Sequence, residues 1–286
     1  MYLGAWEANC GTILEAERMK DSLLLAGEYT KIIMRSWFQY KVDAVLRSLA
    51  VFLREACAIM AIYFTLLKFD TLHGWDMYEM LFLNSLLYVT YGILIIFFTG
   101  FRDFGRTVRT GNFDRYILRP RGLLFQIIFS NADWFAAIGH GGLGIALFIF
   151  CAGKVGIVWN AGNIVYYILS IVGGVLIQGA IFLIFASLNF YLLETGALKG
   201  LLYWDMRKFA GYPLSIFHEA VQIGLIYVVP FAFVNYFPAQ FLLRKADMEQ
   251  YPEIYLYLTL PVGIVMYLLA YWFWRVSLRA YKSSGN

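Results

Sequence analysis

Charged residues are scarce in this chain. They make up 15% of its 286 residues, against 61% hydrophobic residues and 19% aromatic ones. Soluble globular domains carry roughly a quarter charged residues. A soluble chain of this length could not cover so much apolar surface with polar side chains. The composition therefore excludes a soluble globular protein and predicts an integral membrane protein.

Residues that carry catalytic or metal chemistry are also few. Cys10, Cys57 and Cys151 match no metal or redox spacing, and the three histidines lie on separate segments without an H-E-x-x-H pattern. The chain has no G-x-S-x-G motif and no G-x-x-x-x-G-K-[ST] phosphate-binding loop. We therefore predict no catalytic residue, no metal site and no cofactor on this chain, which cannot hydrolyse ATP with a P-loop of its own.

Long apolar runs, by contrast, are abundant. A membrane-spanning helix needs about 20 mainly apolar residues. The fourth run has 31 residues, or about 46 Å as a helix, and therefore must tilt or project beyond a hydrocarbon core of about 30 Å. We predict an all-α polytopic membrane protein with six spans, at 49–67, 78–99, 134–152, 163–193, 218–237 and 254–274.

Lysine and arginine are distributed unevenly between the two sets of connections. Nineteen of the 23 lie before or at the start of the first span, after the second and fourth spans, or in the C-terminal tail. Basic residues favour the cytoplasmic side, so both termini are predicted to be cytoplasmic. We expect a cytoplasmic segment at 1–48, a transmembrane domain at 49–276 and a cytoplasmic tail at 277–286.

Charges mixed with apolar residues at helical spacing mark residues 15–47. This pattern predicts an amphipathic helix along the inner membrane face. A solvated helix that packs on a partner protein is the alternative.

Polar side chains inside the predicted spans are the next candidates, because charge in a membrane is costly and often functional. Arg54 and Glu55 are sequence neighbours and point about 100° apart on a helix, so we expect no simple pair and predict that Arg54 reaches for the interface. Asp133 and His140 share a helical face, which favours hydrogen bonding between helices over a proton relay.

The fourth span carries two further polar side chains, Gln178 and Asn189. Each is a candidate for the translocation path, and each suits a hydrogen bond to a neighbouring helix equally well. The stretch GGVLIQG at 173–179 has small residues on successive turns, which predicts tight helix packing.

The connection at 101–122 is the most specified polar segment of the chain, with six arginines. Gly111 permits a tight turn, Asn112 suits an N-cap and Pro120 stops a helix. A short helix is therefore predicted between them. A merely solvated basic loop would not need its apolar residues, which indicate docking into a groove of another protein: Phe113, Tyr116, Ile117 and Leu118.

At these residues the chain resembles the ABC-2-type permease family, the six-span membrane subunits of ABC exporters. One branch has a loop close to TGNFDRYILRP, found here at 110–120. LHGW at 72–75, YPLSIF at 212–217 and IYVVPFAFVNYFPAQFLL at 226–243 are further similarities. The resemblance extends from about residue 30 to 276.

The resemblance implies a dimer of six-helix subunits in a bacterial plasma (inner) membrane. The second permease subunit is expected to be identical or similar. Two copies of a separate P-loop ATPase, which would bind ATP and Mg²⁺, are expected to dock on the cytoplasmic face. Residues 15–47 would be the connecting helix, and no nucleic acid partner is implied.

The resemblance also implies that 101–122 contains a coupling helix. Apolar contact to the ATPase is expected from Phe113, Tyr116 and Leu118. Charge-assisted hydrogen bonds would fix the orientation of the coupling helix. Gly111 and Pro120 would fix its two ends. The polar residues assigned to orientation are Asp114, Arg115 and Arg119.

The family implies export by alternating access. The 25 Phe, 21 Tyr and 8 Trp favour an apolar or amphipathic substrate. We expect the first span with the 15–47 helix, together with the fifth span, to form much of the dimer contact. The resemblance implies this in part, and Pro230 and Pro238 leave backbone groups of the fifth span in need of partners. The alternatives are a secondary transporter or channel that acts without an ATPase, and a membrane-embedded enzyme of lipid or glycan metabolism.

Overall fold

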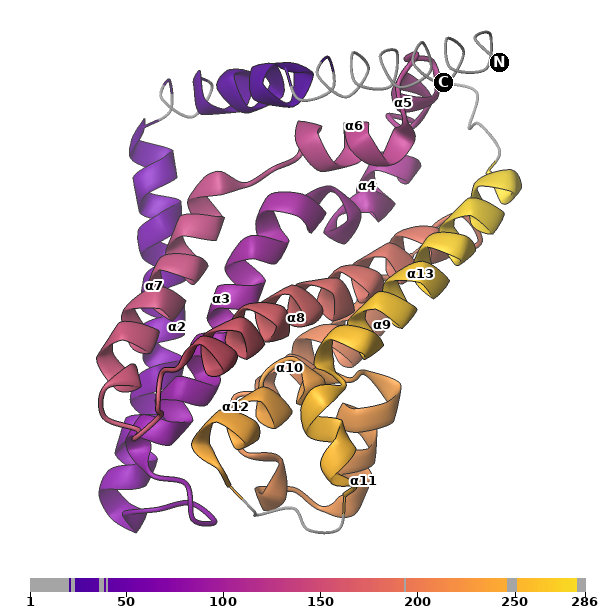
Figure 1. Ribbon diagram of the computed structural model, residues 1–286. Helices are drawn as coiled ribbons and strands as arrows, with labels where there is room; N and C mark the ends of the chain where they lie inside the picture. The colour runs from indigo at the N-terminus through magenta and orange to yellow at the C-terminus, as the bar shows by residue number, and fades with distance from the viewer. Residues whose placement is uncertain are drawn as a thin grey trace, which may run out of the picture.

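The computed structural model describes residues 21, 24–35, 39, 41–192, 194–245 and 251–281, and these residues form helices and connections without a β-strand (Figure 1). The long helices are α2 (Lys41–Phe69), α3 (Met77–Arg102), α7 (Trp134–Ala152), α8 (Ala161–Leu188) and α13 (Thr259–Ser277). The short ones are α4 (Phe104–Arg109), α5 (Asp114–Ile117), α6 (Leu123–Ser130), α9 (Gly196–Lys199), α10 (Met206–Phe209), α11 (Glu219–Ile223) and α12 (Tyr236–Leu243).

The described part of the chain has five helices long and apolar enough to cross a membrane, and a sixth crossing if one bent helix pair is counted as a span. This confirms the predicted all-α polytopic membrane protein. The long helices correspond to the first four predicted spans and the last. Residues 24–35, α4 to α6 and Tyr281 lie at one end of the bundle, here named the basic end (Figure 1). The 72–75 turn and α12 lie at the opposite end.

α3 is the central helix of the bundle. It packs on α7 and α8 along much of its length and is buried over most of its turns. Its start is fixed by a capping box: the Asp76 side chain accepts from the Glu79 N–H, and the Glu79 side chain accepts from the Asp76 N–H. The LHGW turn before it buries Trp75 against Tyr236 of α12.

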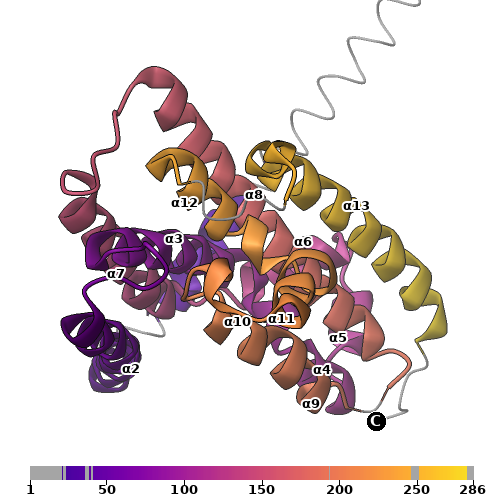
Figure 2. The same ribbon diagram turned by 90° about the horizontal axis from the view of Figure 1, so that it is seen from below.

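α8 and α13 run side by side and obliquely through the bundle (Figures 1 and 2). Their close approach depends on glycine. A Cβ placed on Gly173 would lie 2.7 Å from the Thr259 carbonyl oxygen, and one on Gly263 would lie 2.6 Å from the Gly173 carbonyl oxygen. The tight packing predicted for GGVLIQG is therefore confirmed.

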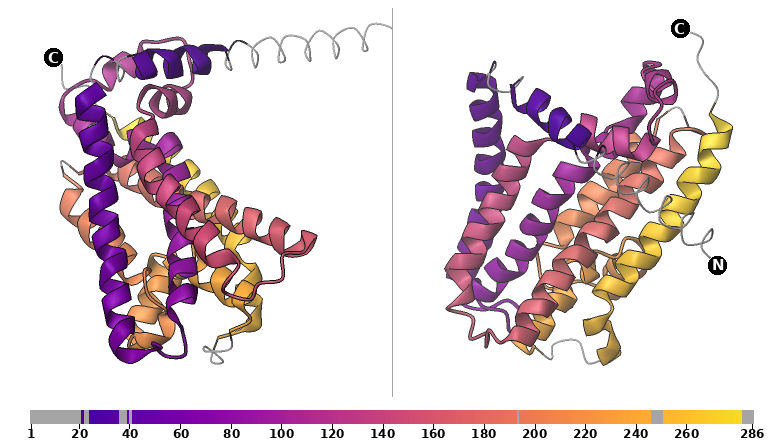
Figure 3. Two further views of the ribbon diagram at one scale, coloured as in Figure 1. Left: turned by 90° about the vertical axis from the view of Figure 1, so that its left-hand side faces the viewer. Right: turned by 45° about the horizontal axis from the view of Figure 1, so that its top comes forward.

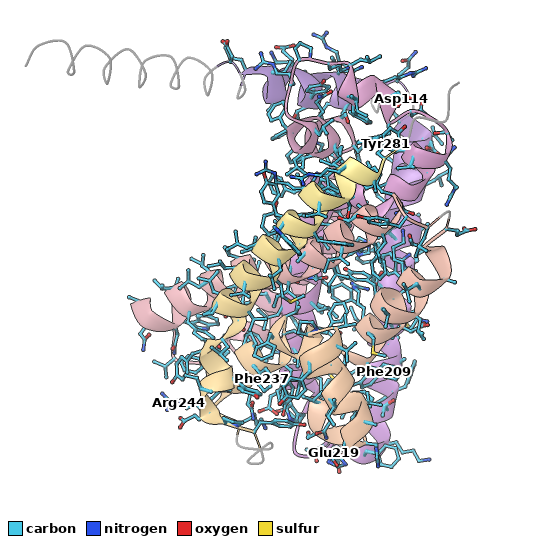
Figure 4. The ribbon with its side chains drawn as sticks, turned by 90° about the vertical axis from the view of Figure 1, so that its right-hand side faces the viewer. Asp114, Phe209, Glu219, Phe237, Arg244 and Tyr281 are labelled. Carbon is cyan, nitrogen blue, oxygen red and sulfur yellow. The ribbon has the colours of Figure 1, made fainter. Side chains whose placement is uncertain are left out.

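The predicted fifth span at 218–237 is not one continuous helix. The chain already returns from the basic end along α3 through residues 196–219, in broken helical pieces. Contacts mark this descent: Lys199 donates to the Arg102 carbonyl, and Asn84 donates to the Gly211 carbonyl at 2.8 Å. Figure 4 shows the same order, with Phe209 farther from the basic end than Tyr281 and Glu219 farther still.

The window at 218–237 instead straddles a bend. Helical residues 219–228 and 231–243 meet at 76°. Pro230, which lacks a backbone N–H, sits at the break. The second arm ends in α12, a short buried helix that is held to the start of α3 by a Lys245–Glu79 ion pair of 2.7 Å.

The N-terminal prediction also changes. α2 begins at Lys41, so the end of the predicted 15–47 amphipathic helix belongs to the first membrane helix. Residues 24–35 form a separate helix across the basic end, and α2 stands along one side of the bundle (Figure 3). Residues 15–20, 22–23, 36–38 and 40 of that prediction lie outside the described residues.

One expectation for the polar residues in the spans is corrected. Arg54 bends back along α2 and pairs with Glu55, with Nη2 2.6 Å from Oε1, because Glu55 is buried and needs a donor. His140 Nδ1 lies 3.6 Å from the same carboxylate oxygen, whereas Asp133 caps the start of α7 by accepting from the Ala136 N–H. The contact between helices that the sequence favoured is therefore present at His140, which faces α2.

Candidate functional site

The basic end is built from the segment at 101–122. After α3 the chain continues into α4, turns at Gly111 and enters α5. Gly111 has φ +68°, a left-handed conformation that glycine adopts without a steric penalty. The predicted turn at Gly111 is therefore confirmed. α5 is a helix of only four residues.

The Phe113 side chain is fully buried. Its ring centroid lies 5.2 Å from that of Phe104, 5.4 Å from that of Phe190 and 4.9 Å from that of Tyr281. These partners come from α4, from the chain after α8 and from the chain after α13. The expected contact between Phe113 and an ATPase is therefore corrected: this ring anchors α5 to the ends of three membrane helices.

Asp114 strengthens this anchor. The Tyr281 hydroxyl donates to Asp114 Oδ1 at 2.8 Å. Desolvation and this hydrogen bond raise the pKa of Tyr281 to about 12, so the hydroxyl keeps its proton and remains a donor at neutral pH. Asp114 thus binds the C-terminal end of this bundle, and its carboxylate is engaged within the chain.

Tyr116 fastens α5 to α6. Its hydroxyl lies 3.0 Å from Ser130 Oγ and accepts from Asn131 Nδ2 at 3.2 Å. The Gln126 side chain donates to the carbonyls of Tyr116 and Arg121, at 3.1 and 2.8 Å. Because the Tyr116 side chain is half-buried, only part of the ring remains for an outside partner.

The outward surface of α5 is apolar at its tip. Leu118 is 83% exposed and Ile117 is 49% exposed, beside the exposed side chains of Arg115 and Arg119. Leu118 is thus placed as the sequence led us to expect, and Ile117 joins it. Exposed aliphatic side chains held on a rigid turn and flanked by arginines are typical of a protein-docking surface.

Two details of the predicted helix differ. Asn112 does not cap α5; its Nδ2 donates to Thr110 Oγ1 at 2.7 Å, and the cap position belongs to Phe113. The helix ends at Ile117, before Pro120 can terminate it. Pro120 instead lies in the exposed bend that leads to α6.

A groove of about 590 Å³ lies between helical residues 24–35 and this segment. Apolar residues of the helix form one wall, and Arg119 reaches the Tyr29 hydroxyl across it at 3.5 Å. Its lining residues are Tyr29, Ile32, Ile33, Arg106, Thr107, Thr110, Asn112, Arg115, Tyr116, Arg119, Ser130 and Asn131. The basic end therefore offers both a protruding apolar tip and a concave surface lined largely by polar and basic side chains.

Gln178 and Asn189 are both buried in helix packing. Gln178 donates to Thr90 Oγ1 at 3.1 Å and accepts from the Tyr203 hydroxyl at 2.8 Å. Asn189 accepts from Thr195 Oγ1 at 3.0 Å. Of the two interpretations left open by the sequence, the structure supports hydrogen bonding to neighbouring elements for both residues.

The arrangement is thus a polytopic helical bundle with a small anchored helix at one end. A family model of ABC-2 family transporter proteins matches residues 52–285. The chain belongs to the ABC-2 transporter family. No curated protein and no solved structure matches it. The predicted family is confirmed: this ABC-2 protein is a multi-pass membrane subunit of a transporter, not itself catalytic, and its family works with ATPase subunits.

The sequence did not indicate the aromatic residues that pack against Phe113 inside the protein. Phe190 and Tyr281 follow the fourth and last membrane helices, and nothing in their local pattern distinguishes them from interfacial aromatic residues. Only the fold brings them to Phe113. The signal available in the sequence was the placement of aromatic residues just after helices that end on one side of the membrane.

Proposed function

We propose that the chain is the permease subunit of an ATP-driven exporter and that α5 with its flanking residues is the coupling segment. A separate P-loop ATPase, in two copies, binds ATP and Mg²⁺. It drives alternating access in a dimer of this chain with an identical or similar permease. The exported substrate is apolar or amphipathic. The protein lies in a bacterial plasma membrane with both termini in the cytoplasm.

The observation that carries this proposal is the two-sided construction of α5. Its outer side presents Ile117 and Leu118 to a partner, and its inner side buries Phe113 between the ends of α4, α8 and α13. A force applied to the tip reaches membrane helices through packed rings, because close-packed interiors transmit displacement. A solvated loop that only sets topology needs no such anchor.

Capture of the ATPase tests the proposal. The permease is expressed with the P-loop ATPase of its own cell and purified in mild detergent. The double variant Ile117→Ser/Leu118→Ser should fold like wild type, because both side chains are exposed, yet lose most of the captured ATPase. Buried interface anchors commonly contribute about 2 kcal/mol or more each, or roughly thirtyfold in affinity.

A matched control removes charge from the same surface. Arg119→Gln/Arg121→Gln changes two exposed side chains and leaves the apolar tip intact. We expect a smaller loss of ATPase, mainly at low salt, because higher salt also screens the arginines of the wild type. Full ATPase capture and full ATP-dependent transport by the double serine variant would show that the coupling assignment is wrong. Transport without any ATPase in proteoliposomes would favour a secondary transporter instead.

A further inference from the structure

A group of charged side chains lies deep in the bundle, away from the basic end. Arg207 of α10 places its guanidinium carbon 4.4 Å from the ring centroid of Tyr91 on α3. Tyr91 is 14 residues from the start of α3 and 11 residues from its end, or about 21 and 16 Å along the helix. Arg207 therefore lies within the depth of the hydrocarbon core, where charge is rare and usually functional.

Two of the guanidinium nitrogens of Arg207 are not satisfied by hydrogen bonds. Nε and Nη2 are buried, and no acceptor in the described part of the chain hydrogen-bonds to them. A carboxylate in electrostatic reach is that of Glu55 on α2, which is engaged by Arg54 at 2.6 Å and lies 3.6 Å from His140. A single carboxylate thus stands between two arginines, which leaves one positive charge without a counter-ion in this group.

The next residue along the chain shows the contrast. Lys208 points outward, with a side chain 76% exposed, and forms an ion pair of 2.8 Å with Asp205. Its charge is therefore balanced within one turn of helix. Arg54 is also outward-facing, with 65% of its side chain exposed. α2 and α10 lie on the same side of α3 (Figure 2).

Such an excess charge in a membrane needs an anion. Buried guanidinium N–H groups without acceptors cost free energy, and an arginine fork fits a carboxylate or phosphate with two parallel hydrogen bonds. Tyr91 stabilises the guanidinium by cation–π contact, and two of its N–H groups keep unused hydrogen-bonding capacity. The site is therefore suited to one anionic group attached to an apolar body.

We propose that Arg207, with Arg54 beside it, binds the anionic headgroup of the transported amphiphile. This deepens the proposed function and rests on it: the substrate class becomes an anionic amphiphile with a carboxylate or phosphate headgroup. Glu55 repels the anion. Because its carboxylate already balances one of the two arginines, the site accepts one further negative charge. Export requires release, and a counter-charge already present in the site limits how tightly an anion is held.

Binding is measured on the purified full-length chain in a neutral maltoside detergent, without ATPase. The probes are dodecyl phosphate and dodecanoate as anionic amphiphiles, dodecanol as the apolar body alone and inorganic phosphate as the headgroup alone. Apparent affinity follows from the rise of the thermal unfolding midpoint with probe concentration. We expect the two anionic amphiphiles to bind at least tenfold more tightly than dodecanol, and phosphate alone to bind weakly.

Four variants locate the effect. Arg207→Gln should weaken dodecyl phosphate binding about tenfold or more, and Arg207→Lys, which keeps the charge but not the fork, less. Lys208→Gln removes the same charge one residue away and should change the affinity less than about twofold. Glu55→Gln should strengthen binding, because it removes the opposing carboxylate.

Equal affinities for Arg207→Gln and Lys208→Gln, or equal binding of dodecanol and dodecyl phosphate, would overturn the proposal. The proposal would also be overturned if Arg207→Gln dissociated a permease dimer and left the probe affinity unchanged. That result would show that Arg207 pairs with a carboxylate of a second copy of the chain. If Arg207→Gln does not fold, the other two variants test the proposal. Arg207→Lys should weaken probe binding and Glu55→Gln should strengthen it. ATPase capture is measured separately, so a failure here leaves the coupling proposal standing.

Discussion

The ring of Phe113 meets that of Tyr281 edge-on, at 88° with centroids 4.9 Å apart, while the Tyr281 hydroxyl donates to Asp114. Phe113 and Tyr281 are far apart in the chain, yet they form one small contact between α5 and the segment after α13. Figure 4 shows Asp114 and Tyr281 together at the basic end. This contact joins the coupling segment to α13, which in turn packs along α8.

Replacement of Phe113 by alanine should destabilise the protein. Loss of a fully buried phenylalanine side chain costs about 3–5 kcal/mol in protein cores. The measurement is denaturant or thermal unfolding of the purified chain in detergent. Leu118→Ala, at an 83% exposed position, serves as the control and should change stability by less than about 0.5 kcal/mol. A Phe113→Ala variant as stable as the control would contradict the anchoring role.

Replacement of Tyr281 by phenylalanine should cost about 1 kcal/mol at neutral pH, because Asp114 loses a donor while the ring contact remains. The raised pKa of Tyr281, about 12, predicts a pH dependence. The folded chain holds the phenol proton more tightly than the unfolded chain, whose tyrosine pKa is about 10. This contribution is complete below about pH 10 and is lost as the pH rises toward 12.

The test compares unfolding midpoints of wild type and Tyr281→Phe across that range. Their difference should be constant from about pH 7 to 9 and should shrink above about pH 10. A difference that does not depend on pH would show that the hydrogen bond to Asp114 is not formed.

Replacement of Gly173 by alanine should force α8 and α13 apart, because the new Cβ would lie 2.7 Å from the Thr259 carbonyl oxygen. Overpacking of this kind costs about 1–3 kcal/mol. Gly142→Ala is the matched control: its Cβ would meet nothing within 4 Å, and alanine favours a helix over glycine by about 1 kcal/mol. Unfolding measurements should therefore give effects of opposite sign.

Cysteine labelling tests the orientation of the bundle. In a background without the native cysteines, Arg244→Cys lies after α12 and Asn112→Cys lies before α5, at opposite ends of the bundle. A membrane-impermeant maleimide should label Arg244→Cys in intact cells and Asn112→Cys only after permeabilisation. The reverse pattern would place the coupling segment outside the cell and exclude contact with a cytoplasmic ATPase.

Much of the fold was predictable because a bilayer restricts the choices. Apolar runs of about 20 residues must be helical to satisfy their backbone groups, so α7 begins and ends at the predicted residues 134 and 152. The small residues of 173–179 predicted close packing for the same local reason: absent side chains permit helix approach wherever the partner lies. The 110–120 motif likewise indicated the family before any contact was known.

The path of the chain between α8 and α12 could not be obtained in this way. Residues 196–209 contain Asp205, Arg207 and Lys208, and a hydropathy window therefore assigns them to a polar connection. The structure places them along α3. Arg207 and Lys208 therefore leave the set of basic residues assigned to the cytoplasmic side, and that side still holds most of the lysines and arginines. The more apolar stretch at 218–237 bends by 76° within the same molecule. Hydropathy measures the cost of burial in lipid, whereas the path of the chain depends on contacts between helices.

The sequence alone determined the helical membrane fold, its long spans and its family, and it indicated the segment that we propose for coupling, because local composition and short motifs carry this information. Tertiary structure decided which side chains of that segment are buried and which are exposed to a partner. Phe113 and Leu118 are both apolar and lie close together in the chain, yet one is fully buried and the other 83% exposed. Rings of Phe104, Phe190 and Tyr281, brought together from distant parts of the chain, make that difference.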